Sequence, residues 1–154
     1  MPEQVTWNKI EEGMELQPLA KVATTRMIIE WAGASGDFNP IHYDVPFAEA
    51  AGMDRPVVQG ALKRQWLVQF ITTWMGNEGT LKKFTCKYRS MDYPRYMRTI
   101  TEPQDGETWL CKGTVKKKYV KDGEALVDCT IWVENGSGEV TTEGKATVIL
   151  PESL

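Results

Sequence analysis

Residues 60–75 read GALKRQWLVQFITTWM, and this stretch predicts the architecture of the whole chain. Its apolar side chains fall on two neighbouring lines of a helix, Leu62, Trp66, Phe70 and Trp74 on one and Leu67, Ile71 and Met75 on the other. Because apolar residues cover most of its circumference, this helix should be enclosed by other elements. The polar residues left for an open side are Lys63, Gln69, Thr72 and Thr73.

The chain beyond this helix alternates with the period of β-strands. The first run, around Phe84, Cys86 and Tyr88, has polar residues between the apolar ones, which predicts a strand with one face in water. Four further runs have strand character: 97–101, 108–120, 125–134 and 140–150. The intervening QDGE, KDGE and ENGSGE segments favour tight hairpins between consecutive antiparallel strands. We therefore predict an α+β fold in which one antiparallel sheet packs on the helix at 60–75.

Two shorter helices are expected before the long one. Thr24 or Thr25 can cap a helix that ends near Gly36. Asp44 can cap a second helix, which has a proline in its first turn and ends near Gly52.

Length and composition indicate one soluble globular domain over residues 1–154. Charged residues balance to −3, which argues against nucleic acid as the main partner. No apolar stretch approaches the roughly 20 residues needed to span a bilayer. The start, MPEQVTWNKIEEG, lacks the pattern of a secretory signal, so we expect a cytoplasmic protein.

The three cysteines, Cys86, Cys111 and Cys129, each interrupt a strand-like run and are absent from any CxxC pair. They are typical of reduced core residues, although a redox or metal role is the alternative. With one histidine and scattered cysteines, the chain offers no plausible metal-ligand cluster.

His42 is the only histidine of the chain, and Asp37 lies five positions before it. Between them, Asn39 and Pro40 form turns, so the segment should fold back and point both side chains into one pocket. A carboxylate and an imidazole together can hold a water molecule, accept a proton from it and return one elsewhere. The alternative from the residues alone is a helix-capping aspartate followed by a surface histidine.

The stretch SGDFNPIHYD, followed by PFAEAAG and RPVVQGAL, resembles the hydratase motif of the MaoC-like family. This family comprises (R)-specific enoyl-CoA hydratases and 3-hydroxyacyl dehydratases of fatty acid metabolism. The resemblance covers about residues 23–74 by motif and the remaining strands by pattern only. It implies the hot-dog fold, a curved antiparallel sheet wrapped around a long central helix.

The resemblance also implies the roles of three residues. Asp37 and His42 match the catalytic pair that activates the water added across a 2-enoyl thioester, or lost in the reverse direction. One would remove a proton from the water and the other would deliver a proton to C2; the sequence does not assign which. Gly60 matches the glycine whose N–H polarises the thioester carbonyl, a role that suits a helix N-terminus. No cofactor beyond the coenzyme A of the substrate is implied, and no metal.

The chain departs from the family pattern in and before the long helix. Gln59 stands where many members have histidine, and because its amide donates and accepts hydrogen bonds, we expect it to shape the site together with Asn39. Lys63, Arg64, Gln65 and Trp66 replace small residues, and the bulk of Trp66 bears on the depth of the acyl pocket.

The expected substrate is the thioester of acyl-CoA or of an acyl carrier protein. An exposed sheet edge, as in other members of the family, points to a homodimer or to a heterodimer with a second hot-dog subunit. Lys116, Lys117 and Lys118 could contact the phosphates of coenzyme A or an acidic carrier protein, or form a solvated strand face. Two other functions stay open: a hot-dog thioesterase, and a non-catalytic acyl-binding subunit of a larger dehydratase.

Overall fold

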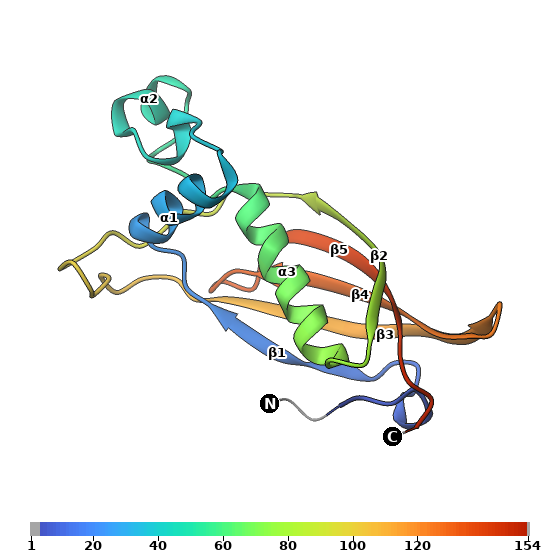
Figure 1. The fold of residues 1–154 in the computed structure, drawn as a ribbon. Coiled ribbons are helices and arrows are strands. Elements are labelled where there is room, and N and C mark those ends of the chain that lie inside the picture. Colours follow the sequence, from blue (N-terminus) through green and yellow to red (C-terminus); the bar gives the residue numbers. More distant parts are fainter. Residues whose placement is uncertain (1–3, 154) are drawn as a thin grey trace.

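The computed structural model describes residues 4–153, so residues 1–3 and 154 of the expected domain lie outside it. One five-stranded antiparallel sheet, in the order β1-β3-β4-β5-β2, curves around a long helix, α3 (Figure 1). The strands are β1 (Glu15–Lys21), β2 (Thr80–Tyr88), β3 (Trp109–Lys121), β4 (Glu124–Glu134) and β5 (Val140–Ile149). The helices are η1 (Trp7–Lys9), α1 (Thr25–Ser35), η2 (Pro40–His42), α2 (Val45–Ala50) and α3 (Gly60–Met75). This arrangement is the predicted α+β hot-dog fold.

Helix α3 lies against the inner face of the sheet, as its apolar circumference predicts (Figure 1). Trp66, Leu67, Phe70 and Ile71 are buried in one core with residues of β3, β4 and β5. Gly113 of β3 allows the helix to approach, because a Cβ atom there would lie 3.1 Å from the Phe70 ring. The assignment of Lys63 to an open side of the helix was wrong. Its side chain is only 2% exposed.

The hairpin β3–β4 follows the predicted turn chemistry. Asp122 and Gly123 both have positive φ, 53° and 79°, as a tight two-residue turn requires. Strands β4 and β5 also pair as consecutive antiparallel neighbours.

Three strand predictions differ from the structure. Residues 97–101 form no strand and contribute only a bridge from Met97 to Pro103. Strand β1 was not predicted, because Pro18 and a register shift interrupt its alternation. The QDGE segment closes no hairpin because the strand predicted before it, at 97–101, does not form, and β2 pairs with β5 instead of with the next strand along the chain. Pairing across the sheet depends on long-range packing, which local turn residues do not specify.

Helices α1 and α2 are both at the end of the molecule where α3 begins (Figure 1). The hydroxyl of Thr24 accepts a hydrogen bond from the Met27 N–H, so Thr24 is the N-cap of α1. Asp44 caps α2 in the same way, through the Phe47 N–H. The end of α1 at Gly36, which has φ 76°, turns the chain into the segment that carries Asp37 and His42. Within residues 4–153, no helix combines the length and the hydropathy needed to cross a membrane.

The cysteines are free thiols that contribute to the core. Cys111 and Cys129 are buried, and Cys86 is half-buried and packs against the core. Burial raises the pKa of the Cys111 and Cys129 thiols to about 12.

Candidate active site

The loop between α1 and α2 brings Asp37 and His42 together. The Asn39 N–H donates to Asp37 Oδ1 at 3.3 Å, and Asn39 Oδ1 in turn accepts from the Ile41 N–H at 3.2 Å. These two turns fold the segment back, as its Asn-Pro sequence predicts, and place Asp37 Oδ2 3.6 Å from His42 Nε2. The cap of η2 is Asn39 rather than Asp37, and His42 is buried, so the alternative of a capping aspartate and a surface histidine does not describe this loop.

His42 is held in one orientation by the backbone of the segment before α3. Its Nδ1 lies 2.8 Å from the carbonyl oxygen of Val57, and the Val57 N–H donates to the carbonyl oxygen of Ile41 at 3.1 Å. A carbonyl oxygen can only accept, so Nδ1 carries the hydrogen and, in the neutral ring, Nε2 has a free lone pair. The Nε2 atom that faces Asp37 is therefore an acceptor.

The separation between the two side chains suits a shared water molecule. At 3.6 Å, Nε2 and Oδ2 are too far apart for a good direct hydrogen bond. The Asp37 side chain is 37% exposed, whereas that of His42 is 9% exposed. The pair therefore combines a fixed, nearly buried imidazole with a carboxylate that solvent and substrate can reach.

Gly60 begins α3, three residues after Val57. Within the described residues, the N–H groups of Gly60 and Ala61 donate to no acceptor, as is usual for the first turn of a helix. The ring of Tyr88 covers Gly60 closely, because a Cβ atom there would lie 2.9 Å from Tyr88 Cε2. Two free N–H groups at the positive end of a 16-residue helix can stabilise a developing oxyanion.

Gln59 is fully buried at the N-cap of α3, and its side chain points away from solvent toward α1. Its Nε2 donates to the carbonyl oxygen of Ile28 at 3.0 Å, while its Oε1 has no partner within residues 4–153. Gln59 thus links the start of α3 to the helix that leads into Asp37. Asn39, the other residue expected to shape the site, does so through the two turns of the loop.

Sequence reasoning missed Tyr88, which it treated as an ordinary strand residue. The end of β2 places this ring against Gly60, and the side chain remains half exposed. Burial is the largest of the effects that raise the pKa of the Tyr88 phenol, and the neighbouring charge of Arg64 opposes it. Trp66, in contrast, is buried. Its ring centroid lies 5.9 Å from that of Trp109, so Trp66 belongs to the core.

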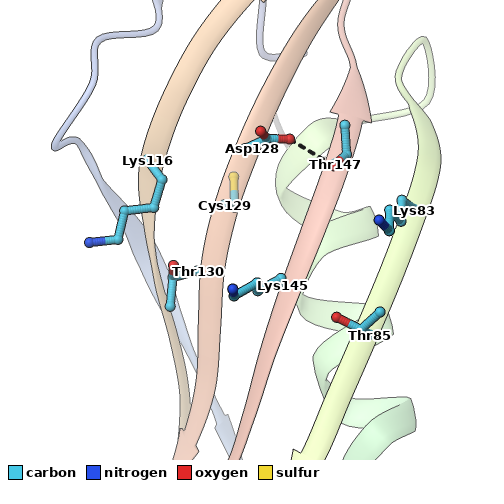
Figure 2. A pocket seen from close by; sticks show the side chains of 8 residues that line it. All are labelled: Lys83, Thr85, Lys116, Asp128, Cys129, Thr130, Lys145 and Thr147. Atoms are coloured by element: carbon cyan, nitrogen blue, oxygen red, sulfur yellow. Dashed lines mark hydrogen bonds between the residues drawn. The ribbon is translucent and has the colours of Figure 1, made fainter.

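The three consecutive lysines of β3 do not form one basic patch. Lys116 lines a groove on the outer face of the sheet, away from α3, together with Lys83 and Lys145 (Figure 2). Lys117 lies over the Tyr119 ring, whereas Lys118 lies 4.0 Å from the Trp7 ring centre and donates to the carbonyl oxygen of Ile10. The groove contains neither member of the Asp37–His42 pair, and its carboxylate, Asp128, accepts a hydrogen bond from Thr147.

The chain matches the family model of the MaoC-like domain over residues 6–124, which is most of its length. It belongs to the MaoC-like domain family. The matched range includes Asp37, His42 and Gly60. Membership of this family supports a hydratase or dehydratase activity. Among curated proteins, the MaoC-like chain is 38% identical over 52 residues to the fatty acid synthase subunit beta of Gibberella zeae. That segment is 34% of this chain and only 2% of the synthase subunit.

Solved structures of low sequence identity share the fold of this MaoC-like chain. The (R)-hydratase from A. caviae involved in PHA biosynthesis is 20% identical with a TM-score of 0.76, covering 93% of this chain and 98% of that one. R-hydratase PhaJ1 from Pseudomonas aeruginosa is 19% identical with a TM-score of 0.78, and the match covers 97% of this chain and 88% of that one. A chain of the ChsH1-ChsH2 complex from Mycobacterium tuberculosis is 20% identical with a TM-score of 0.73, and the match covers 91% of this chain and 98% of that one.

Proposed function

We propose that this MaoC-like protein is a hydro-lyase that adds water to a 2-enoyl-CoA thioester, or removes it, to give or consume an (R)-3-hydroxyacyl-CoA. The observation that carries the proposal is the geometry of the pair: His42 Nδ1 is bound to the Val57 carbonyl oxygen, and Nε2 is directed toward Asp37. The (R) configuration follows from the family alone. A carbon–oxygen lyase needs such a pair to move a proton while water is added.

In the hydration direction, a water molecule held between Asp37 and His42 attacks C3 of the thioester. As the C3–O bond forms, His42 Nε2 accepts one proton of the water, and the electrons of the C2=C3 bond move onto the thioester oxygen. Asp37 orients the water and stabilises the imidazolium. When the enolate collapses, C2 takes the proton from Nε2, so in this proposal His42 carries out both proton transfers, in place of the division between Asp37 and His42 that the resemblance implies. One water is thus added across the double bond, and both side chains return to their starting state.

The oxyanion of this enolate needs donors that are already in place. The free N–H of Gly60 is the group assigned to that role, aided by the dipole of α3. No further cofactor is proposed, because the thioester of the substrate already acidifies its own α-position. Coenzyme A enters only as part of the substrate, and an acyl carrier protein is the alternative carrier.

The MaoC-like chain should act as a dimer, with itself or with a second hot-dog subunit. Strand β2 lies at one edge of the sheet and pairs only with β5 among the described residues, so its other side is available for a partner strand. The resemblance to a chain of the ChsH1-ChsH2 complex supports a heteromeric arrangement as one form. Light scattering of the purified chain, alone and with co-purifying protein, distinguishes the two forms.

A panel of trans-2-enoyl-CoA substrates of different chain length tests the proposed reaction. Loss of the ultraviolet absorbance of the enoyl thioester, with chiral analysis of the product, is the expected result. Release of free thiol from saturated acyl-CoA would instead identify a thioesterase. Binding of acyl-CoA without any absorbance change, alone or with a partner subunit, would indicate a non-catalytic acyl-binding subunit.

A further inference from the structure

A lysine and an aspartate form a buried ion pair beside the candidate site. Lys63 lies in the first turns of α3, and its Nζ donates to Asp92 Oδ2 at 2.6 Å and to the carbonyl oxygen of Ser90 at 2.9 Å. Both side chains are almost completely buried, at 2% and 1% exposure. The second oxygen of Asp92 accepts from Trp109 Nε1 at 2.8 Å. Buried charges are costly unless each is paired and hydrogen-bonded, and here both are.

Stability alone is a poor explanation for this pair. A cation in the first turns of a helix opposes the helix dipole, and replacing a buried ion pair by apolar residues is often neutral or stabilising. A buried pair can instead fix one arrangement of the elements that it joins, because moving either element would leave a charge buried without its partner. Lys63 belongs to α3, Asp92 follows β2, and Trp109 begins β3.

The backbone of Asp92 connects this pair to His42. The carbonyl oxygen of Asp92 accepts from the Val58 N–H at 2.8 Å. The preceding residue, Val57, accepts from His42 Nδ1 at 2.8 Å. The two consecutive valines are therefore held on one side by the Asp92 loop and on the other by the imidazole. The same segment continues directly into Gly60.

We propose that the buried Lys63–Asp92 pair is a positioning device, which fixes the Val57–Val58 segment so that His42 keeps its Nδ1–H form and Gly60 presents its N–H to the substrate. Neither Lys63 nor Asp92 is assigned contact with the substrate. The expected effect of the pair on turnover rests on the proposed hydratase function, whereas its expected effect on the tautomer of His42 does not.

The test uses the fact that His42 is the only histidine of the chain, so its side-chain ¹⁵N resonances need no assignment. The double variant Lys63→Met/Asp92→Asn removes both charges, keeps similar volumes and leaves an acceptor for Trp109. The expected result is a folded protein in which the nitrogen shifts move from the Nδ1–H form toward a mixture of tautomers. With an active substrate, kcat should fall about tenfold while KM changes little, because misplacement of reacting groups acts on the chemical step.

The matched control is Lys112→Met/Glu134→Gln. This pair joins β3 to β4 at 2.7 Å, and among the described residues neither side chain has a hydrogen bond or ion pair with the segment before α3. It should leave both the ¹⁵N spectrum of His42 and kcat unchanged.

Unchanged ¹⁵N shifts of His42 in a folded Lys63→Met/Asp92→Asn protein would overturn the proposal. If that variant does not fold, hydrogen exchange in the native protein decides: the Val58 N–H should exchange only through global unfolding, and exchange through local opening would refute the positioning role. If no enoyl thioester is turned over by the native protein, the proposed function fails, while the His42 spectra still test the device.

Discussion

His42 Nδ1 and the carbonyl oxygen of Val57 are 2.8 Å apart, and this contact joins the loop after α1 to the segment that begins α3. The Val57 N–H also donates to the Ile41 carbonyl oxygen, so the two backbone stretches are joined at two points. The Asp37–His42 pair and the N-terminus of α3 are therefore parts of one connected unit. Displacing either stretch should affect both.

Removing either polar group of the pair should reduce turnover without unfolding the protein. Asp37→Asn and His42→Gln should each lower kcat by ~10²-fold or more, the usual loss for a general acid or base. The exposed carboxylate of Asp54 offers a matched control, because Asp54→Asn in the same region should leave kcat unchanged. Steady-state kinetics and thermal melting measure these effects, and rates equal to those of the native protein in either pair variant would end the proposed mechanism.

Gly60→Ala should displace the Tyr88 ring, because the new Cβ atom would lie 2.9 Å from Tyr88 Cε2. Since the ring is half exposed it can move outward, so we expect a folded protein with kcat lowered about tenfold or more through misplaced donors. Gly33→Ala is the matched control. A Cβ atom at Gly33 meets nothing within 4 Å, so this change in α1 should raise the free energy of unfolding by about 0.5–1 kcal/mol and leave kcat unaffected. Equal kinetics for the two variants would show that Gly60 has no special role.

Asn39→Ala should loosen the loop that carries Asp37 and His42, because the Ile41 N–H loses its side-chain acceptor. The expected loss of unfolding free energy is about 1 kcal/mol, as for other helix caps, and kcat should fall as the Asp37–His42 distance varies. Asn39→Ser retains an oxygen acceptor and should recover most of the lost unfolding free energy and most of the lost kcat. Chemical denaturation together with kinetics checks the result; a loss of stability with unaltered kcat would limit Asn39 to a structural role.

The three cysteines should differ in reactivity toward a thiol reagent. Cys86 is half-buried and should react first, whereas Cys111 and Cys129 should react only on unfolding, because burial raises the pKa of each to about 12. Thiol titration at pH 8, with Cys86→Ser as control, measures the difference. Three equal rates in the native protein would contradict it.

The same two thiols predict a dependence of stability on pH. Their pKa values in the folded protein, about 12, exceed the ordinary value of 9.0, so in the unfolded chain the thiols lose their protons first as the pH rises. The stability that they contribute is fully present below pH 9 and is lost between about pH 9 and 12. Unfolding curves of the native protein and of Cys111→Ala should converge in this range, and a constant difference between them would exclude the effect.

Much of the fold follows from periodic patterns in the sequence. The apolar circumference of α3, the alternation of β3, β4 and β5, and the caps at Thr24 and Asp44 were all predictable, because each is set by residues close together in the chain. Strand β1 and the pairing of β2 with β5 were not. Alternation indicates that a strand has an apolar face but not which strand lies beside it.

The candidate site divides in the same way. The turn residues between Asp37 and His42 predicted that the two side chains meet, and the three segments SGDFNPIHYD, PFAEAAG and RPVVQGAL together were enough to indicate the family. Only the tertiary structure determines the direction of the imidazole, which depends on Val57, and the burial of Lys63, which the helical pattern had placed in solvent. Local sequence specifies which residues can turn, alternate or titrate. Packing determines which distant group holds the Nδ1–H of His42, the Val57 carbonyl, and which one neutralises the buried charge of Lys63, the Asp92 carboxylate, because these partners come from other parts of the chain.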